Sequence, residues 1–538
     1  MDQKIFINQV GYLPKGDKHF LTVCGPGSFD IKNKDGDCVY SGKLLLFKEN
    51  DSASGMTLYK GDFSSFTQDG QFTIETENLT SYPFIIGEDV FNAVRNDSIR
   101  SFYFQRSGMK LEKRDAGEFA RPAGHTSLLE YHWSSPVNGS KDVSGGWYDA
   151  GDFGRYITPG SVAIGLMMMG YEQYPEKFSS DFLDEIRYEL EWMLKMQYLE
   201  EGEFNGALPY MLNSRNYVWE LPHVESEPQY IYDFSSFATA DFAAVMALAA
   251  RNFNNVDPVF AEKCLAASRF AWKFLKANKD YPAGGFQRPS DTKTGGYATN
   301  GADNKDISEG MFWAAVELFL TTGEQGFHDF ARNGLNSASD FKGGMSWQSK
   351  SGFAKMQYVL GNHNSIDRLL QNKLTGFLID HCNELLSIIN SNGFHSSLKD
   401  REYLWGSNGE LLTRAQYLIF AYLKTGNKDF YNGALDQLNY ILGMNGNNIC
   451  FVTNHGSKFP EHIHHAAMDT DGISASYPGL IPGGPNCNIS QDEKLAIHFT
   501  KNTPPALCYT DDVKSFASNE NCITYNAPLI PVSAFFSN

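Results

Sequence analysis

Two aspartates lie three residues apart in a glycine-rich segment, Gly145-Gly-Trp-Tyr-Asp-Ala-Gly-Asp-Phe-Gly-Arg-Tyr156. Carboxylates on a tight loop can converge on one water, so Asp149 and Asp152 could share the tasks of holding that water and taking its proton. The alternative is structural, because aspartate also stabilises turns and caps the helix that follows. The residues alone leave both interpretations open.

A second candidate carboxyl group is Glu520, which lies among Phe516, Ile523 and Tyr525. Apolar neighbours desolvate a carboxyl group and help it to keep its proton, as a general acid requires. An ordinary glutamate at the start of a helix is the alternative interpretation.

Four histidines fall within eleven residues, at His455, His462, His464 and His465. Imidazole is the commonest transition-metal ligand in proteins. However, no cysteine and no regular helical His-x-x-x-His spacing accompanies them. We therefore expect hydrogen bonds to a polar ligand rather than a metal centre.

The composition of the chain limits what kind of protein positions these groups. Its 538 residues are 42% hydrophobic and 20% charged, which is enough to form a folded core. The net charge of −18 disfavours nucleic acid and anionic membrane surfaces as partners. No apolar run approaches the roughly 18 residues that a membrane helix needs. We expect neither a nucleic-acid nor a membrane partner.

The cysteines and the N-terminus say little about the compartment. Eight cysteines are scattered without a Cys-x-x-Cys pair, which favours free thiols over a disulfide framework. The first residues lack the basic and apolar regions of a signal peptide, but a processed chain would lack them too. The protein is secreted or periplasmic if such a peptide has been removed, and cytoplasmic otherwise.

Residues 1–88 have the pattern of a small antiparallel β-sandwich. Short apolar runs such as His19–Val23 and Gln71–Ile74 recur near every ten residues. Turn residues such as Asp35-Gly36-Asp37 separate some of these runs.

Helical periodicity begins near Val90 and continues through most of the chain. Two segments, Phe312–Gly323 and Tyr417–Gly426, share one design: an apolar helix, a Thr-Gly stop and an aromatic residue that opens the next helix. Such hairpins predict a helical toroid with long loops at one end. The other predicted helices are 158–174, 183–196, 235–253, 258–277, 366–389, 410–425 and 429–442. The long loops, where chemistry is expected, are 107–151, 199–228, 284–306 and 445–519.

The three candidate segments together resemble the signature regions of glycoside hydrolase family 9, the inverting β-1,4-glucanases. They are Gly145–Tyr156, the His464 segment and the Glu520 segment, in this order. The run Asn8-Gln-Val-Gly-Tyr-Leu-Pro14 is similar to the start of the immunoglobulin-like module that precedes many of these catalytic domains. The resemblance implies an all-α (α/α)6 barrel over residues 89–538 behind an immunoglobulin-like β-sandwich over residues 1–88.

The resemblance also implies roles for the candidate residues. Asp152 resembles the catalytic base, Asp149 its partner on the same water, and Glu520 the general acid. An inverting mechanism needs a water beside the anomeric carbon, so the Asp152 and Glu520 carboxyl groups should lie about 6.5–9.5 Å apart. His464 and Tyr525 resemble residues of the subsite that holds the reacting sugar, and we add Trp147 as a candidate substrate-binding residue.

The chemistry that the resemblance implies requires no cofactor, but metals could stabilise the fold. Many relatives bind a structural zinc through two Cys and two His, whereas Ser107 and Gly124 stand in the two cysteine positions here. We therefore expect no zinc. Asp303, Asp306 and Glu309 precede the Phe312 helix where relatives often hold calcium, and their oxygens suit that ion. They could equally be acidic residues that stabilise the helix dipole.

We expect an endo-acting β-1,4-glucanase, monomeric, whose partner is a β-1,4-linked polysaccharide or oligosaccharide. An exo-β-glucosidase or exo-β-glucosaminidase acting on short oligosaccharides is the alternative within this class. Ala466 bears on that choice, because the family has an arginine there and its loss would make the subsite more tolerant of glucosamine. Alternatives from other classes are a non-catalytic carbohydrate-binding protein and a polysaccharide lyase. Retention of all three carboxylates argues against a non-catalytic protein. The negative net charge and Ala466 argue against a lyase, which would need a cation or an arginine to neutralise a uronate.

Overall fold

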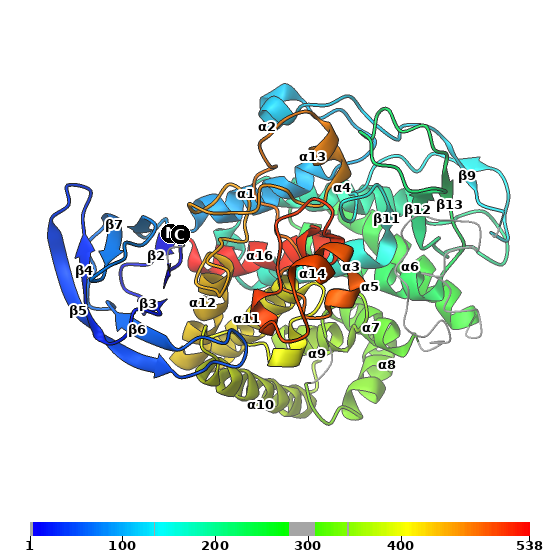
Figure 1. The fold of residues 1–538 in the computed structure, drawn as a ribbon. Coiled ribbons are helices and arrows are strands. Elements are labelled where there is room, and N and C mark those ends of the chain that lie inside the picture. The colour runs from blue at the N-terminus through cyan, green and yellow to red at the C-terminus, as the bar shows by residue number, and fades with distance from the viewer. Residues whose placement is uncertain (1–3, 134, 279–306, 342–343) are drawn as a thin grey trace. The chain divides into compact units, whose positions relative to one another are not determined.

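A computed structural model describes residues 4–133, 135–278, 307–341 and 344–538 of the chain (Figure 1). The chain forms two compact units, one made of Met1–Ser101 with Cys382–Asn538 and the other of Phe102–His381. The predicted loop 284–306 lies outside the described residues. Among the helices that are described, none has the length and apolar character to cross a membrane.

The N-terminal part of the first unit is built from eight short strands in the order β1-β3-β6-β5-β4-β7-β8-β2. Neighbours are antiparallel except β2 and β8, which run parallel. The short strands predicted from the sequence are thus present, with one parallel pair that the alternating pattern did not predict. The strands are β1 (Ile5–Phe6), β2 (Gly11–Tyr12), β3 (His19–Thr22), β4 (Gly27–Lys32), β5 (Cys38–Lys48), β6 (Leu58–Asp62), β7 (Gly70–Glu75) and β8 (Phe84–Ile86).

Aromatic rings fill the core between these strands. Phe20 and Phe29 pack edge to face at 4.9 Å and are almost completely buried. Their rings lie directly over the backbone of Gly61 and Gly42, at positions where a Cβ atom would collide with them. Glycine in these two strands therefore admits the rings, although it weakens a strand in general.

The strand domain is joined to the helical part of the same unit through Gln9. The Gln9 main-chain N–H donates to the Leu442 carbonyl at 2.9 Å, and its side-chain Oε1 accepts from the N–H groups of Ser457 and Lys458. Its Nε2 donates to the Asn448 carbonyl at 3.1 Å. One buried side chain thus holds the start of the long loop that follows residue 445.

The helical part of the first unit packs around α11 (Ser407–Thr425), which contacts α12 (Lys428–Ile441) and α16 (Ile523–Phe536). Gly426 ends α11 in the left-handed conformation, with φ +71°, as the Thr-Gly stop predicted. Short helices follow in the loops: α13 (Ala466–Thr470), α14 (Glu493–His498) and α15 (Phe516–Asn519). Helices α1 (Asn92–Phe104) and α10 (Arg368–Ser391) have residues in both units.

The second unit is centred on α5, which packs against α3, α6 and α7. Helices α3, α5 and α7 are buried along most of their lengths, as expected for helices that are apolar on more than one face. The described helices are α2 (Lys113–Ala116), α3 (Ile157–Gln173), α4 (Phe182–Met196), α5 (Ser236–Phe253), α6 (Pro258–Ala277), α7 (Ser308–Thr322), α8 (Gln325–Asn336) and α9 (Ser351–Leu360). The helices predicted here begin and end within a few residues of these bounds.

A small five-stranded sheet lies within the predicted loops 107–151 and 199–228 and directly after them. Its order is β10-β9-β13-β12-β11. The strands are β9 (Leu129–Tyr131), β10 (Ser140–Lys141), β11 (Arg155–Tyr156), β12 (Met211–Ser214) and β13 (Gln229–Ile231). Because β11 ends the glycine-rich segment, the sheet fixes one end of the aspartate loop.

Candidate active site

The loop that carries Asp149 and Asp152 begins with two glycines in the left-handed region. Gly145 and Gly146 have φ values of +109° and +80°. A Cβ atom at Gly146 would lie 2.5 Å from Cδ2 of Trp192, so only glycine lets the chain pass this close to α4.

Two buried glutamates of α4 hold the next residue of the loop. The main-chain N–H of Trp147 donates to Oε2 of Glu189, and its indole Nε1 donates to Oε1 of Glu185 at 2.8 Å. Glu185 also pairs with Arg106 at 2.9 Å. Trp147 is only 1% exposed, and its two hydrogen bonds to α4 help to hold the loop. Its contact with a sugar, which we expected from the sequence, stays a prediction.

Further hydrogen bonds fix the carbonyl groups of the loop. Gln105 Nε2 donates to the carbonyls of Tyr148 and Ala150, at 3.3 and 3.0 Å. The buried Arg155 donates from Nη1 to the Gly145 carbonyl at 2.9 Å. The backbone on both sides of Asp149 is therefore held by side chains from within the same unit.

The two aspartates differ in exposure. Asp149 is 3% exposed, and its N–H donates to the Gly154 carbonyl at 2.9 Å. Asp152 is half-buried, and its Oδ1 accepts from the Gly154 N–H at 3.3 Å, which is a local aspartate turn. Neither aspartate caps α3, whose N-cap is Tyr156. A purely structural role therefore explains the turn at Asp152, but neither aspartate serves as a helix cap.

Glu520 and His464 are neighbours in the first unit although they are far apart in sequence. They pair in a short parallel bridge in which the His464 N–H donates to the Asn519 carbonyl at 3.0 Å. On the other side, the Gly483 N–H donates to the Glu520 carbonyl at 2.8 Å. Glu520 directly follows α15 and does not start a helix, and its side chain is half-buried.

The His464 ring is held in one tautomer. Its Nδ1 lies 2.5 Å from the Val513 carbonyl, so Nδ1 carries the proton and Nε2 is the acceptor. Burial lowers the pKa of His464, which keeps the ring neutral at pH 7. A neutral imidazole beside Glu520 suits a hydrogen bond to a hydroxyl group.

Two of the other clustered histidines have structural partners. His465 accepts the Met468 N–H at Nδ1 and caps α13, while His455 lies 3.1 Å from Oδ2 of Asp97. Within the described ranges, no group of three His, Cys, Asp or Glu side chains has the geometry to hold a metal.

Aromatic side chains lie in the same part of the first unit, where the ring centroids of His464 and Phe516 are 6.1 Å apart. Tyr525 packs over the backbone of Gly406 and Gly409, where a Cβ atom would come within 2.8 and 2.9 Å of its ring. Trp405 and Phe516 form a pair with ring centroids 5.5 Å apart, and they are 41% and 36% exposed. Trp405 carries no functional signal in the sequence, because an aromatic residue before a helix usually packs in the core.

The candidate metal residues have protein partners where they are described. Glu309 Oε2 accepts from Ser349 Oγ at 3.1 Å and from the Lys350 N–H at 2.8 Å, whereas Asp303 and Asp306 lie outside the described residues. Both ring nitrogens of His125 are engaged, one by Tyr148 Oη at 2.6 Å and the other by Glu225 at 2.7 Å.

Both regions with candidate residues fall inside one family match. The sequence model of glycosyl hydrolase family 9 matches residues 91–533, and that of the cellulase N-terminal Ig-like domain matches residues 1–81. The chain belongs to glycosyl hydrolase family 9. As a family 9 member it is a glycoside hydrolase of the cellulase type with an N-terminal Ig-like domain, and glycoside hydrolysis needs no cofactor.

Characterised family 9 proteins resemble this chain over its whole length. A cellodextrinase from Butyrivibrio fibrisolvens is 30% identical over 98% of both chains. A xyloglucan-specific endo-β-1,4-glucanase from Bacteroides ovatus is 30% identical over 98% of this chain and 93% of its own. The solved structure of AaCel9A in complex with cellobiose-like isofagomine superposes with a TM-score of 0.90, at 26% identity over 99% of both chains.

Proposed function

We propose that this family 9 enzyme hydrolyses β-1,4-linked glucan with inversion at the anomeric carbon. The observation that carries the proposal is the rigid attachment of the aspartate loop, with Asp149 and Asp152 at its turn, within the region that matches the family. Glu520, paired with His464, supplies the third carboxyl group. The named activities of the relatives, on cellodextrin, cellulose and xyloglucan, support this substrate class.

The three carboxyl groups have separate tasks in the proposed mechanism. Asp152 takes a proton from water while the more buried Asp149 orients that water. Glu520 donates its proton to the leaving oxygen on the opposite side of the sugar. The Asp152 and Glu520 carboxyl groups would then lie about 6.5–9.5 Å apart, leaving room for the water.

Side chains around Glu520 would hold the sugar. The neutral His464 ring accepts a hydrogen bond at Nε2 from a hydroxyl group of the sugar. Tyr525 contacts the sugar next to it. Trp405 and Phe516, whose ring planes are inclined by 50°, each offer an exposed apolar ring face on which a sugar ring can stack.

We propose the following framework for this site. The helices of residues 89–538 form an (α/α)6 barrel, and the strands of residues 1–88 form its Ig-like neighbour. The 0.90 TM-score to AaCel9A supports this architecture. We expect no zinc in this framework, because Ser107 and Gly124 offer no thiolate and both nitrogens of His125 have protein partners. Calcium at Asp303, Asp306 and Glu309 stays a prediction.

An exo-acting enzyme on short oligosaccharides is the second candidate, favoured by the similarity to a cellodextrinase over the full length of both chains. A preference for glucosamine rests on Ala466, which opens α13 and is fully buried.

One experiment tests the proposed function and separates these candidates. Purified enzyme is incubated with soluble cellulose, cello-oligosaccharides and chitosan oligomers, and the anomer of the first product is read by NMR. We expect the α-anomer first, with a fall in viscosity of soluble cellulose for endo action. The β-anomer as first product would contradict inversion. Release of glucosamine alone would replace glucan by chitosan as the substrate.

A further inference from the structure

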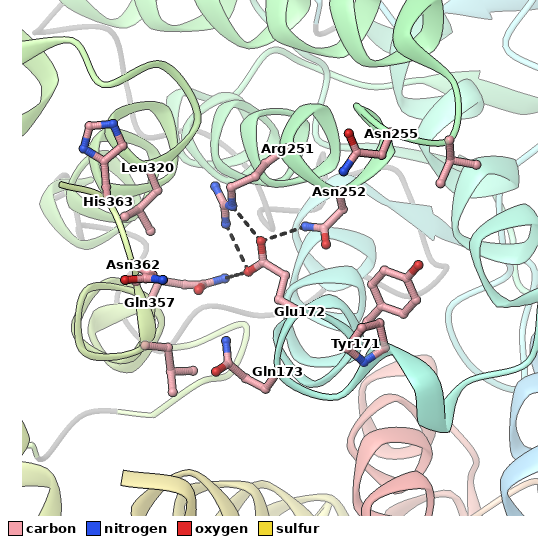
Figure 2. A pocket seen from close by; sticks show the side chains of 14 residues that line it. Tyr171, Glu172, Gln173, Arg251, Asn252, Asn255, Leu320, Gln357, Asn362 and His363 are labelled. Carbon is pink, nitrogen blue, oxygen red and sulfur yellow. Dashed lines mark hydrogen bonds and ion pairs between the residues drawn. The ribbon is translucent and has the colours of Figure 1, made fainter.

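The second unit contains a pocket at the ends of its buried helices, well away from the aspartate loop. We call it the helix-end pocket; Glu172, Arg251, Asn255, Leu320, Gln357 and Asn362 are among its lining residues, and its volume is about 480 Å³. These residues come from the C-terminal ends of α3, α5, α7 and α9 or directly follow them (Figure 2). The aspartate loop precedes the other end of α3, which is 17 residues or about 25 Å long.

The charged groups of the pocket neutralise one another. Arg251 Nε and Nη2 lie 2.6 and 3.1 Å from the Glu172 carboxylate, and Nη2 also lies 2.7 Å from Oε2 of Glu317. Glu317 is fully buried, and burial raises its pKa to about 7. The guanidinium of Arg251 is therefore compensated by two carboxyl groups and is not free to attract an anion.

The helix ends add a second argument against an anionic ligand. The last carbonyl groups of a helix lack partners within the helix, and the helix dipole is negative at this end. Four such ends meet around the pocket. The electrostatic environment therefore favours hydrogen-bond donors without negative charge.

The remaining groups of the pocket wall can both donate and accept hydrogen bonds. Asn252 and Gln357 donate their amide N–H groups to Glu172, at 2.9 and 3.3 Å, which fixes their orientation. The carboxamides of Gln173, Asn255 and Asn362 also line the pocket and form no side-chain hydrogen bond with another described residue. Carboxamides match the donor and acceptor pattern of hydroxyl groups.

Apolar groups complete the wall. Leu320 and Leu360 border the amides, and Val256 and Pro175 extend the apolar part. The volume lies in the range of 300–1,000 Å³ that is usual for small-molecule sites, and the wall is more polar than that of most such sites. Sugars carry both kinds of surface, hydroxyl groups at the rim of the ring and C–H groups on its faces.

We propose that the helix-end pocket is a second binding site, for a neutral, hydroxyl-rich small molecule of the size of a mono- or disaccharide. The charge balance and the amide wall carry this assignment. Only the choice of glucose as the probe rests on the proposed function, since glucan hydrolysis yields such sugars.

The test measures glucose binding by ligand-observed NMR titration while the candidate active site is saturated with cellobiose-like isofagomine. Asn255→Trp and Asn362→Trp place a bulky ring in the pocket. Asn254→Trp and Asn364→Trp are matched controls, because both asparagines are exposed neighbours that do not line it. Thermal unfolding confirms that all four variants fold.

We expect saturable glucose binding to the wild type that weakens by about tenfold or more in both pocket variants, the equivalent of one or two lost hydrogen bonds. The controls should bind as the wild type does, and glucose 6-phosphate should bind about tenfold more weakly than glucose because of its negative charge. Absence of glucose binding, equal binding by all variants, or tighter binding of the phosphate would overturn the proposal.

A turnover assay on glucan distinguishes failure of the helix-end pocket proposal from failure of the proposed function. An enzyme that cleaves glucan but does not bind glucose in the titration overturns the helix-end pocket alone. An enzyme that is inactive on glucan but binds glucose in a manner sensitive to Asn255→Trp overturns only the proposed function.

Discussion

The main-chain N–H of Trp147 donates a 2.6 Å hydrogen bond to the buried carboxyl group of Glu189. This bond ties the aspartate loop to α4 two residues before Asp149. Burial raises the pKa of Glu189 well above its usual value, so the carboxyl group is protonated over a wider pH range than an exposed glutamate. Glu189 is therefore a positioning residue in the proposed mechanism.

Replacing Glu189 tests this role. Glu189→Leu leaves the Trp147 N–H buried without an acceptor, which should lower the free energy of unfolding by about 1–3 kcal/mol. The displaced loop should lower kcat up to about 100-fold with little change in KM. Glu189→Gln keeps an acceptor oxygen and should stay close to the wild type at pH 7.

The control is Glu191→Gln on the exposed side of the same helix. It should leave kcat unchanged and lower the free energy of unfolding by no more than about 0.5 kcal/mol, because it removes only an exposed ion pair with Arg187. Kinetics that are equal for Glu189→Leu and the wild type would show that the loop needs no such tether.

Glu520→Gln tests the proposed general acid. The amide keeps the shape but has no acidic proton, so turnover of cello-oligosaccharides should fall by about 10²–10⁴-fold while ligand binding persists. An aryl glycoside with a good leaving group should retain much more activity, because its oxygen needs little protonation. Glu493→Gln, an exposed glutamate of α14, is the control. Equal losses on both substrates would argue against the acid role.

The separate roles of Asp149 and Asp152 can be tested by comparing their asparagine variants. Asp152→Asn should reduce kcat more than Asp149→Asn if Asp152 accepts the proton and Asp149 only orients the water. Added azide should restore turnover of Asp152→Asn and give a glycosyl azide of inverted configuration. Losses of the same size would leave the two roles undivided, and a retained configuration would contradict the mechanism.

Acid stability should depend on His19, which is buried against His395 and Lys60. Burial holds the pKa of His19 well below its usual 6.5, so the unfolded chain binds a proton that the folded chain does not. Stability from this group is complete above pH 6.5 and is lost as the pH falls, by about 1.4 kcal/mol per unit. His19→Phe should remove this loss between pH 6.5 and 5.

The measurement is the unfolding midpoint of wild type and variant from pH 5 to 8. His395, whose pKa burial lowers to about 3, and Asp436, whose pKa burial raises to about 7, are present in both proteins. Their titration therefore largely cancels in the difference. His498→Phe, at an exposed position, should shift the midpoint equally at every pH. A similar constant shift for His19→Phe would refute the prediction.

Metal analysis of the purified protein should find zinc well below one atom per chain. By the resemblance, Ser107 and Gly124 stand where many relatives have the cysteine ligands of zinc, and a Cβ atom at Gly124 would lie 2.5 Å from the Pro222 carbonyl oxygen. One bound zinc per chain, retained after dialysis against a chelator, would show that other ligands have taken over.

Local signals in the sequence were sufficient for most helices. The period of 3.6 located α3, α5 and α11, and the stops at Gly323 and Gly426 adopt the left-handed conformation that their Thr-Gly sequence predicted. Helix α16 was missed, because Pro528 and Pro531 lie inside it and proline usually ends a helix. The helix is almost entirely buried, and packing compensates for the lost hydrogen bonds.

The small sheet and the role of Trp147 could not be read from local patterns. Strands of two to four residues carry almost no periodicity, and β9 and β13 pair only after the chain has folded back on itself. The sequence places Trp147 beside the aspartates but gives no sign that Glu185 and Glu189, some 40 residues later, bury it. Conversely, Trp405 gains its exposed place beside Phe516 through tertiary structure alone.

The contacts of Gln9 with residues in the C-terminal part of the chain can form only late in the synthesis of this protein. Its partners Leu442, Asn448 and Ser457 leave the ribosome only after the whole stretch 102–381 has been made. Between residue 88 and Ser457 about 370 residues must be made, which at 5–20 residues per second takes roughly 18–74 s. During that time the surface around Gln9, which later contacts the helical part of the unit, is exposed to solvent. A nascent chain with such an exposed surface is open to aggregation or chaperone binding.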